Sequence, residues 1–289
     1  MIVSASYRTD IPAFHGDWFM NRLDAGFCQV ANPHGGKPYR VEMTAEAVDG
    51  FVFWTRNVGP FMDGLTEIRR RGLPFVVQFT ITGYPRVLEP SVVDADRAIA
   101  QLRSIAERFG SRAVVWRYDP ILLTSLTGGD WQRANFSRLA TAIGGVCDEV
   151  VFSFADFYAK TRRNLSHAAR DHGFTWAEPP IEERRALLHD LAAIARDNGL
   201  RPTLCVEPDL VAPGIAAASC IDAARLSDVA GKRISAREKG NRPGCACAES
   251  RDIGAYDSCV QGCVYCYAVR DPAAARDRFT RHDAWSEAL

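Results

Sequence analysis

Five cysteines lie close together near the end of the sequence, in the segment CACAESRDIGAYDSCVQGCVYCYA, residues 245–268. Three of them, Cys259, Cys263 and Cys266, have the spacing C-x3-C-x2-C. Three thiolates on one short loop can bind three irons of a cubane cluster, and Gly262 gives that loop the backbone freedom to wrap tightly. The fourth iron is then open to a substrate, a cofactor or another thiolate. We therefore predict a 4Fe–4S cluster on this loop.

The other two cysteines of the segment, Cys245 and Cys247, leave several arrangements open. Either of them could supply a fourth thiolate, and the closed cluster would then be structural or electron-carrying. Both could instead help to bind a second metal. A tetrahedral zinc ion could also take four of the five thiols, although zinc sites usually pair C-x2-C with a second such pair. The cysteines elsewhere stand singly in apolar stretches and are interpreted as small core residues: Cys28, Cys147, Cys205 and Cys220.

The composition is that of an ordinary globular protein, and it limits the classes of partner that we expect. The 289 residues are 47% apolar and 24% charged, which suits one barrel-sized domain or two smaller ones. Thirty-five basic residues balance 35 acidic ones, so nucleic acid is not indicated as a partner. No apolar run reaches membrane-spanning length, and the N-terminus lacks the features of a signal peptide. We expect a cytoplasmic protein without a membrane partner, in which clustered thiols stay reduced and serve metal binding or catalysis.

Short runs rich in β-branched and aromatic residues alternate with helical patterns along the chain. The runs predicted as strands are 2–6, 50–55, 75–82, 113–118, 149–154 and 203–207. Residues 95–110 and 181–199 repeat apolar side chains at helical spacing and end at glycine. This alternation predicts an α/β fold, a single TIM-like (β/α) barrel over residues 1–240. A doubly wound open sheet is the alternative, but its glycine-rich first turn is missing from SASYRTDIPAF.

Polar residues follow most of the predicted strands at their carboxyl ends, where barrels hold their active sites. Within 75–82 the alternation places Gln78 and two threonines on one face of the strand. Any one of these residues could be a solvated loop residue or a local cap. Their recurrence around the ring favours one shared pocket instead. We predict as catalytic residues Arg8, Asp10, Arg117 and Asp119, and as cofactor-binding residues Thr55, Gln78, Ser153 and Asp156.

The sequence resembles, over nearly its whole length, a bacterial family described only as a domain of unknown function. The resemblance is carried by SASYRTDIPAF, VFWTRN, VVQFTITGY, VVWRYDPILL, VVFSFADFY and the terminal cysteine segment. That family implies no reaction. The three-cysteine spacing, with Tyr265 before the last cysteine, is the signature of the radical SAM superfamily, and GCVYCYA is similar to the ending in relatives of spore photoproduct lyase. This second resemblance implies that S-adenosylmethionine binds the open iron through its amino and carboxylate groups.

The position of the cysteine loop departs from the radical SAM pattern. Those enzymes carry the loop after their first strand, whereas here it follows six predicted strands and leaves only 23 residues for the usual Gly-Gly-Glu segment. A circular permutation would reconcile the two, with residues 241–289 packed on the barrel beside its first strand as the cluster-binding segment. Either 231–235 or 252–256 could be the strand that leads into the loop. Chain ends often lie close together, so the rearrangement costs little.

The strand-end residues would then hold the cofactor. Arg8 or Arg117 would bind a carboxylate through the two-pronged guanidinium, while Asp10, Asp119 or Asp156 would suit an amine or ribose hydroxyls. The sequence therefore predicts an iron–sulfur, radical SAM-like enzyme that acts on an unknown small-molecule or macromolecular substrate, with ferredoxin or flavodoxin as an electron donor. The alternatives are a closed-cluster electron-transfer or structural protein and a barrel protein with a structural zinc site.

Overall fold

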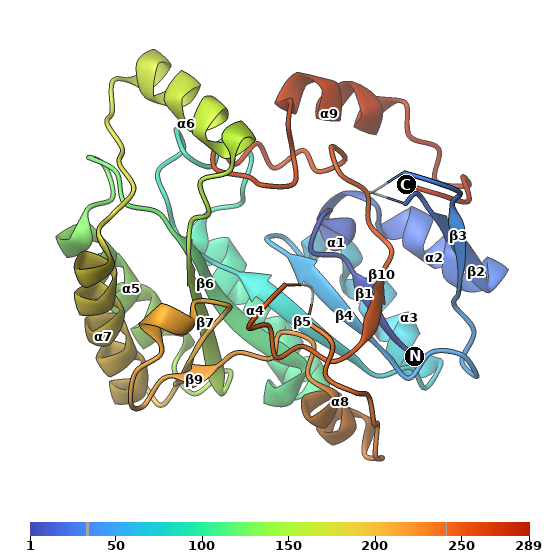
Figure 1. Ribbon diagram of the computed structural model, residues 1–289. Helices are drawn as coiled ribbons and strands as arrows, with labels where there is room; N and C mark the ends of the chain where they lie inside the picture. The colour runs from blue at the N-terminus through green and yellow to red at the C-terminus, as the bar shows by residue number, and fades with distance from the viewer. Residues whose placement is uncertain (33–34, 241) are drawn as a thin grey trace.

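The computed structural model describes residues 1–32, 35–240 and 242–289, and a parallel sheet of eight strands forms its centre (Figure 1). In their order across the sheet the strands are β10 (Ser250–Asp252), β1 (Ile2–Ala5), β4 (Gly50–Thr55), β5 (Phe75–Thr80), β6 (Val114–Ile121), β7 (Glu149–Phe154), β8 (Arg201–Leu204) and β9 (Ala216–Ala217). Every neighbouring pair in this sheet is parallel. A separate antiparallel hairpin joins β2 (Phe27–Val30) to β3 (Tyr39–Glu42). The predicted α/β class is confirmed.

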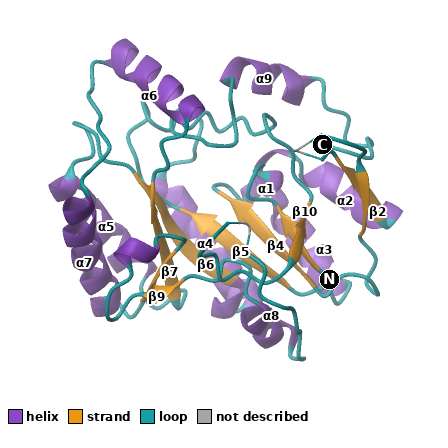
Figure 2. Ribbon diagram, viewed as in Figure 1, coloured by secondary structure: helices purple, strands orange, loops and turns teal. Residues whose placement is uncertain are grey.

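Most of the helices surround this sheet (Figure 2). They are α1 (Ile11–Phe14), α2 (Gly16–Ala25), α3 (Met62–Arg70), α4 (Ala95–Phe109), α5 (Gly129–Ile143), α6 (Ala159–His172), α7 (Ile181–Asp197), α8 (Ala223–Ala230) and α9 (Pro272–Thr280), with 3-10 turns at Gly59–Phe61, Ser111–Ala113 and Pro208–Leu210. Apolar side chains of α3, α4, α5 and α7 form one core with one face of the sheet. In Figure 1, α6 and α9 lie above the carboxyl ends of the strands. Within the described ranges, no helix is long and apolar enough to cross a membrane.

The period of two along β5 decides which side chains reach which face. Phe75, Val77 and Phe79 are buried in the core that faces the helices. Val76 belongs to the core on the opposite, inner face. Toward the carboxyl end of the strand this inner face changes from apolar to polar, with Gln78 next in the alternation. The inner face is therefore apolar at one end of the strands and polar at the other.

The strands follow one another across the sheet without a reversal of order, from β1 through β4 to β9. Because βαβ crossovers are right-handed, such an order places all of the crossover helices on one face, as in a barrel, whereas a doubly wound sheet reverses at a switch point. In the described parts of the chain, no ladder of hydrogen bonds joins β9 to β10. Side chains from 218–240 and from 242–248, between the two edge strands β9 and β10, pack on the apolar inner face of the sheet.

The last strand of the sheet lies beside the first. Residues Ile2, Val3 and Ser4 of β1 pair with Ser250, Arg251 and Asp252 of β10. Of the two segments considered as the strand before the cysteine loop, 252–256 overlaps β10 by one residue. The other alternative, 231–235, is not a strand, because these residues form a turn and irregular coil after α8. The segment 241–289 thus contributes one strand to the sheet itself as well as α9.

Candidate functional site

A cavity of about 550 Å³ opens on the inner side of the sheet, at the carboxyl ends of the strands. This volume lies in the range of about 300–1,000 Å³ that is usual for small-molecule and cofactor sites. The predicted site residues that line it are Arg8, Asp10, Thr55, Arg117, Asp119, Ser153, Asp156, Cys245, Cys247, Cys259, Cys263 and Cys266. Gln78 is the exception: it is buried behind the wall, where it donates to the carbonyl of Cys220 and accepts from Arg117. The structure brings strand ends and both groups of predicted metal ligands to one place.

The cysteine loop is attached to the sheet through Asp10. Its carboxylate accepts hydrogen bonds from Gln261 of the loop at 2.7 Å, from the Thr55 hydroxyl at 2.6 Å and from the backbone N–H of Arg56 at 2.9 Å. It also caps α1 by accepting from the Ala13 N–H. Burial raises the pKa of Asp10, and these hydrogen bonds oppose that rise. With its acceptor positions filled, Asp10 acts as a positioning residue that fixes the loop.

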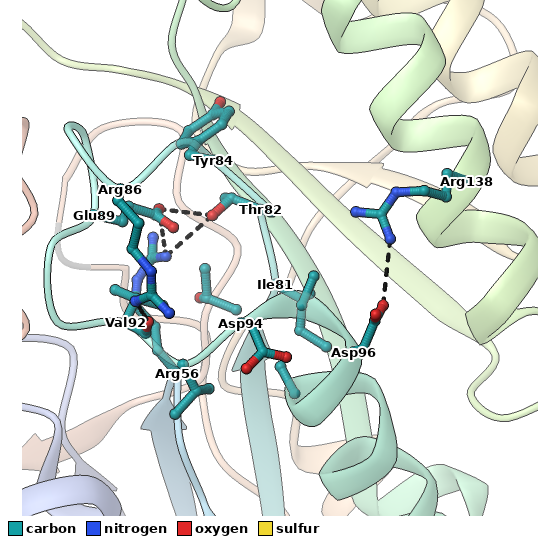
Figure 3. Close-up of a pocket in the computed structure, with 15 residues that line it drawn as sticks. Arg56, Ile81, Thr82, Tyr84, Arg86, Glu89, Val92, Asp94, Asp96 and Arg138 are labelled. Carbon is teal, nitrogen blue, oxygen red and sulfur yellow. Dashed lines mark hydrogen bonds and ion pairs between the residues drawn. The ribbon is translucent and has the colours of Figure 1, made fainter.

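A second attachment runs through Arg56, which was not among the predicted site residues. Its guanidinium donates to Glu89 at 2.7 Å, to Thr82 at 3.2 Å and to the Tyr265 hydroxyl at 2.9 Å, and Tyr265 in turn donates to Glu89. Figure 3 shows Glu89 facing both Arg56 and Thr82, beside a smaller cavity of about 350 Å³. In the sequence Tyr265 stands between Cys263 and Cys266. This buried network therefore fixes the position of the cysteine loop relative to the sheet.

The three cysteines of the loop are free thiols whose surroundings suit a metal cluster. Burial raises the pKa of all three, that of Cys263 to about 12, so a neighbouring cation is needed to hold them as thiolates. The N–H of Ala268 donates to the Cys266 sulfur at 3.3 Å. Such a hydrogen bond orients a thiolate that binds a metal. Across the described ranges, no three His, Cys, Asp or Glu side chains converge closely enough for one metal ion. A cubane places each thiolate on its own iron, which spreads the ligands farther apart than one ion does.

Arg8 is held by a buried carboxylate that the sequence analysis did not assign. Its Nε and Nη2 atoms donate to one oxygen of Asp252 at 3.0 and 2.8 Å. The hydroxyls of Ser4 and Ser6 and the N–H of Gly254 also donate to Asp252. Asp252 ends β10, so this cluster fixes the edge strand from which the cysteine loop begins. The guanidinium of Arg8, which we expected to bind the carboxylate of a ligand, is thus already paired with the carboxylate of Asp252.

Arg117 is likewise paired inside the chain. Its Nε and Nη2 donate to the two oxygens of Asp119 at 2.9 and 2.6 Å, and the remaining nitrogen contacts the Cys220 sulfur at 2.9 Å. The guanidinium stacks on Trp54 with 4.8 Å between its carbon and the ring centre. Ser153 donates to Asp119 at 3.4 Å. This group forms a rigid polar wall of the cavity rather than a free anion site. Asp156, at the rim, pairs with Arg242 at 2.7 Å.

The structure also collects a second group of thiols, which comprises Cys205, Cys220, Cys245 and Cys247. All four line the cavity. The sulfurs of Cys205 and Cys220 lie 3.7 Å apart, and the Cys247 sulfur accepts from the N–H of Ile221 at 3.4 Å. Cys28 and Cys147 are core residues as expected. The interpretation of Cys205 and Cys220 as core residues alone missed this grouping, which no local sequence pattern signals.

Tyrosines and one lysine lie at the mouth of the cavity. Tyr158, Tyr256 and Tyr267 line it and are exposed. The ammonium of Lys160 lies 5.0 Å from the centre of the Tyr256 ring. Burial raises the pKa of the Cys266 thiol, and the charges of Arg56 and Lys160 oppose that rise. Lys160 therefore places a positive charge near the outer end of the cysteine loop.

Comparison with known proteins gives a family without a reaction. No curated protein matches the chain. The family model described as "Domain of unknown function (DUF1848)" matches residues 2–268. The match runs from β1 to the residue after Tyr267, so it includes the sheet, both groups of thiols and the whole cysteine loop. The chain belongs to the DUF1848 family.

Proposed function

We propose that the protein is a radical SAM-like enzyme that holds a 4Fe–4S cluster on Cys259, Cys263 and Cys266. S-adenosylmethionine would bind at the open iron, and the reduced cluster would supply the electron that starts radical chemistry on the substrate. The observation that carries the proposal is geometric: the three thiols line the same cavity of about 550 Å³ as the polar strand ends. An electron donor such as ferredoxin or flavodoxin would act from outside the cavity.

A permuted, partial (β/α) barrel is the fold that we propose for this chemistry. It is supported by the strand order without reversal and by the parallel pairing of β10 with β1. The strand that leads into the cysteine loop is then the spatial first strand, although it is the last in sequence. This arrangement removes the disagreement between the position of the loop along the chain and the radical SAM pattern.

The surroundings of Cys247 favour an iron that is open to a cofactor. Its sulfur accepts from the Ile221 N–H and belongs with Cys220 and Cys205, in the group that contacts Arg117. The charge of Arg56 acts instead on Cys263 and Cys266 of the loop, where it opposes the rise in the pKa of both thiols. To become the fourth ligand of the loop cluster, Cys247 would have to leave these contacts. Cys245 packs against the same apolar cluster as Cys220 and Cys247, whereas Cys263 and Cys266 belong to another one.

Lys160 is our choice for the residue that binds the carboxylate of the cofactor. Arg8 and Arg117 are already paired with Asp252 and Asp119, so they shape the wall of the cavity. Lys160 lines the cavity, and its charge acts on Cys266. The exposed ring of Tyr256 lies beside it, and Tyr158 lines the same cavity, so either ring can stack on a planar adenine.

Binding of S-adenosylmethionine tests the proposal. We expect the anaerobically purified protein to bind the labelled cofactor in equilibrium dialysis, and Lys160→Met to weaken that binding about tenfold or more. A charge-assisted hydrogen bond contributes about 1.5–3 kcal/mol, and 1.4 kcal/mol is a factor of ten in affinity. Lys232→Met, in the turn after α8 and outside the cavity lining, is the matched control and should bind normally. No binding by wild-type protein that carries its cluster would refute the proposed function.

A further inference from the structure

The two helices above the carboxyl ends of the strands carry an excess of positive charge. Helix α6 and the segment 270–281, which contains α9, hold eight lysines and arginines against three aspartates, in a chain whose 35 basic and 35 acidic residues balance. We call these eight residues the basic surface: Lys160, Arg162, Arg163, Arg170, Arg270, Arg276, Arg278 and Arg281. All of them except the half-buried Lys160 are exposed.

Contacts between the two segments join their charges into one surface. The side-chain amide of Asn164, in α6, donates to the carbonyl of Arg270 at 3.4 Å. Tyr256 contacts both helices: the Lys160 ammonium lies 5.0 Å from the centre of its ring, and Arg278 donates to its carbonyl at 3.1 Å. Figure 1 shows α6 and α9 next to each other above the sheet. The basic residues of both helices therefore face an approaching partner together.

Much of this charge is not neutralised within the chain. The three aspartates of the two segments are engaged, either in the cap of α9 or in a contact with a basic side chain four residues away: Asp171, Asp271 and Asp277. Arg162 pairs with Glu178 at 2.7 Å. Among the residues that the structure describes, Arg163, Arg270 and Arg276 form no ion pair with a carboxylate. These three arginines leave positive charge available to an acidic partner.

The basic surface adjoins the cysteine loop. A small cavity of about 20 Å³ is lined by Cys259, Cys263 and Cys266 and, from α9, by Pro272 and Arg276. A cavity of this size has room for about one water molecule. Neither Pro272 nor Arg276 lines the large cavity, so α9 meets the loop from another side. Arg276 is exposed as well, which makes this the side on which the loop comes close to the basic surface.

We propose that the basic surface is the docking site of an acidic electron-carrier protein. The inference rests on the proposed function, because it requires a cluster on the loop that accepts an electron. The carrier is oxidised by one electron and the cluster is reduced by one, and no bond forms or breaks. Complementary charge steers the carrier to this surface, beside the loop that it must reduce. Nucleic acid would be attracted by the same charge, but it supplies no electron.

Charge reversal at two of the unpaired arginines tests the docking site. We expect Arg270→Glu with Arg276→Glu to slow reduction of the cluster by reduced flavodoxin about tenfold or more at low salt, since electrostatic steering raises association rates by about 10–10³-fold. Anaerobic stopped-flow absorbance measures the second-order rate constant. The difference from wild type should shrink as salt is added, because about 0.1 M salt screens charges that are more than about 10 Å apart.

The matched control changes the net charge equally at a distant place. Lys232→Glu with Arg233→Glu lies just after α8, which Figure 1 shows at the opposite end of the strands from α9. This variant should be reduced at the wild-type rate. Photoreduction with a small deazaflavin needs no docking surface, so it should reduce the cluster of every variant as it does that of wild type. Should Arg270→Glu with Arg276→Glu lose iron, Arg163→Glu with Arg170→Glu on α6 takes its place.

The docking site and the proposed function fail in different ways. A variant that keeps its iron and takes electrons from flavodoxin at the rate of the control would overturn the docking site. Weaker binding of duplex DNA by that same variant would then assign the basic surface to nucleic acid. If the rate falls as expected but wild type binds no S-adenosylmethionine, the proposed function fails and the docking site stands. A wild-type protein without iron would overturn both.

Discussion

Cys263→Ser should remove about four irons and four sulfides per chain while the protein stays folded. A 4Fe–4S cubane held by three thiolates cannot keep one corner without its ligand, because the exposed iron is lost and the rest follows. Cys263 is the middle ligand of the loop and lines the cavity beside Tyr265 and Arg56. Iron and sulfide analysis after anaerobic purification measures the effect, together with the visible absorption of the cluster.

Cys28→Ser provides the control for this loss. Cys28 is a buried thiol of β2 that takes no part in the cavity, so its replacement should leave the iron content unchanged. Circular dichroism shows whether each variant has kept its fold. A folded Cys263→Ser protein with the iron of wild type would contradict the assignment of the cluster to this loop.

Asp252→Asn should destabilise the protein by about 3–5 kcal/mol. Removing one partner of a buried ion pair leaves the other charge uncompensated, and Arg8 and Asp252 are 4% and 7% exposed at their side chains. Ser4, Ser6 and Gly254 all donate hydrogen bonds to the carboxylate of Asp252. An asparagine amide replaces one acceptor oxygen by an N–H₂ donor, so some of these hydrogen bonds are lost. Urea unfolding measures the change in the free energy of unfolding.

The surface pair of Asp277 and Arg281 offers a matched comparison. Both side chains are well exposed at the end of α9, so Asp277→Asn should leave the free energy of unfolding nearly unchanged. Because Asp252 ends the strand before the cysteine loop, Asp252→Asn should also lower the iron content. If Asp252→Asn loses no more stability than Asp277→Asn, the hydrogen-bonded group around Asp252 does not hold the edge strand.

Much of the sheet could be predicted because its strands carry a strong local signal. The predicted strands at 50–55 and 149–154 coincide with β4 and β7, where continuous apolar runs are buried on both faces. β10 has only the residues Ser, Arg and Asp, and nothing in them predicts a strand. Its place beside β1 is set by long-range contacts, above all those of Asp252. Sequence patterns report local conformational preference. This edge strand forms because of its contacts with β1, so such patterns could not predict it.

The location of the candidate site could be predicted from the sequence better than the function of each residue in it. The period of two and the rule for parallel sheets located the cavity and nearly all of its predicted lining. The roles depend on partners, and Arg8 meets a carboxylate 244 positions away in sequence. Arg117 and Asp119, two apart on one strand, are the exception, because residues at that spacing share a face. Cys205 and Cys220 sit in apolar runs, so only the fold reveals that their sulfurs meet.

The electron paramagnetic resonance spectrum of the reduced protein, with and without S-adenosylmethionine, tests the central claim most directly. The proposal requires an iron that no thiolate of the chain occupies, so binding of the cofactor there must alter the electronic surroundings of the cluster. We predict about four irons and four sulfides per chain on the loop cysteines, and a spectrum that changes on adding the cofactor. A cluster whose spectrum stays the same at saturating cofactor, or a chain that carries zinc without iron, would contradict the account.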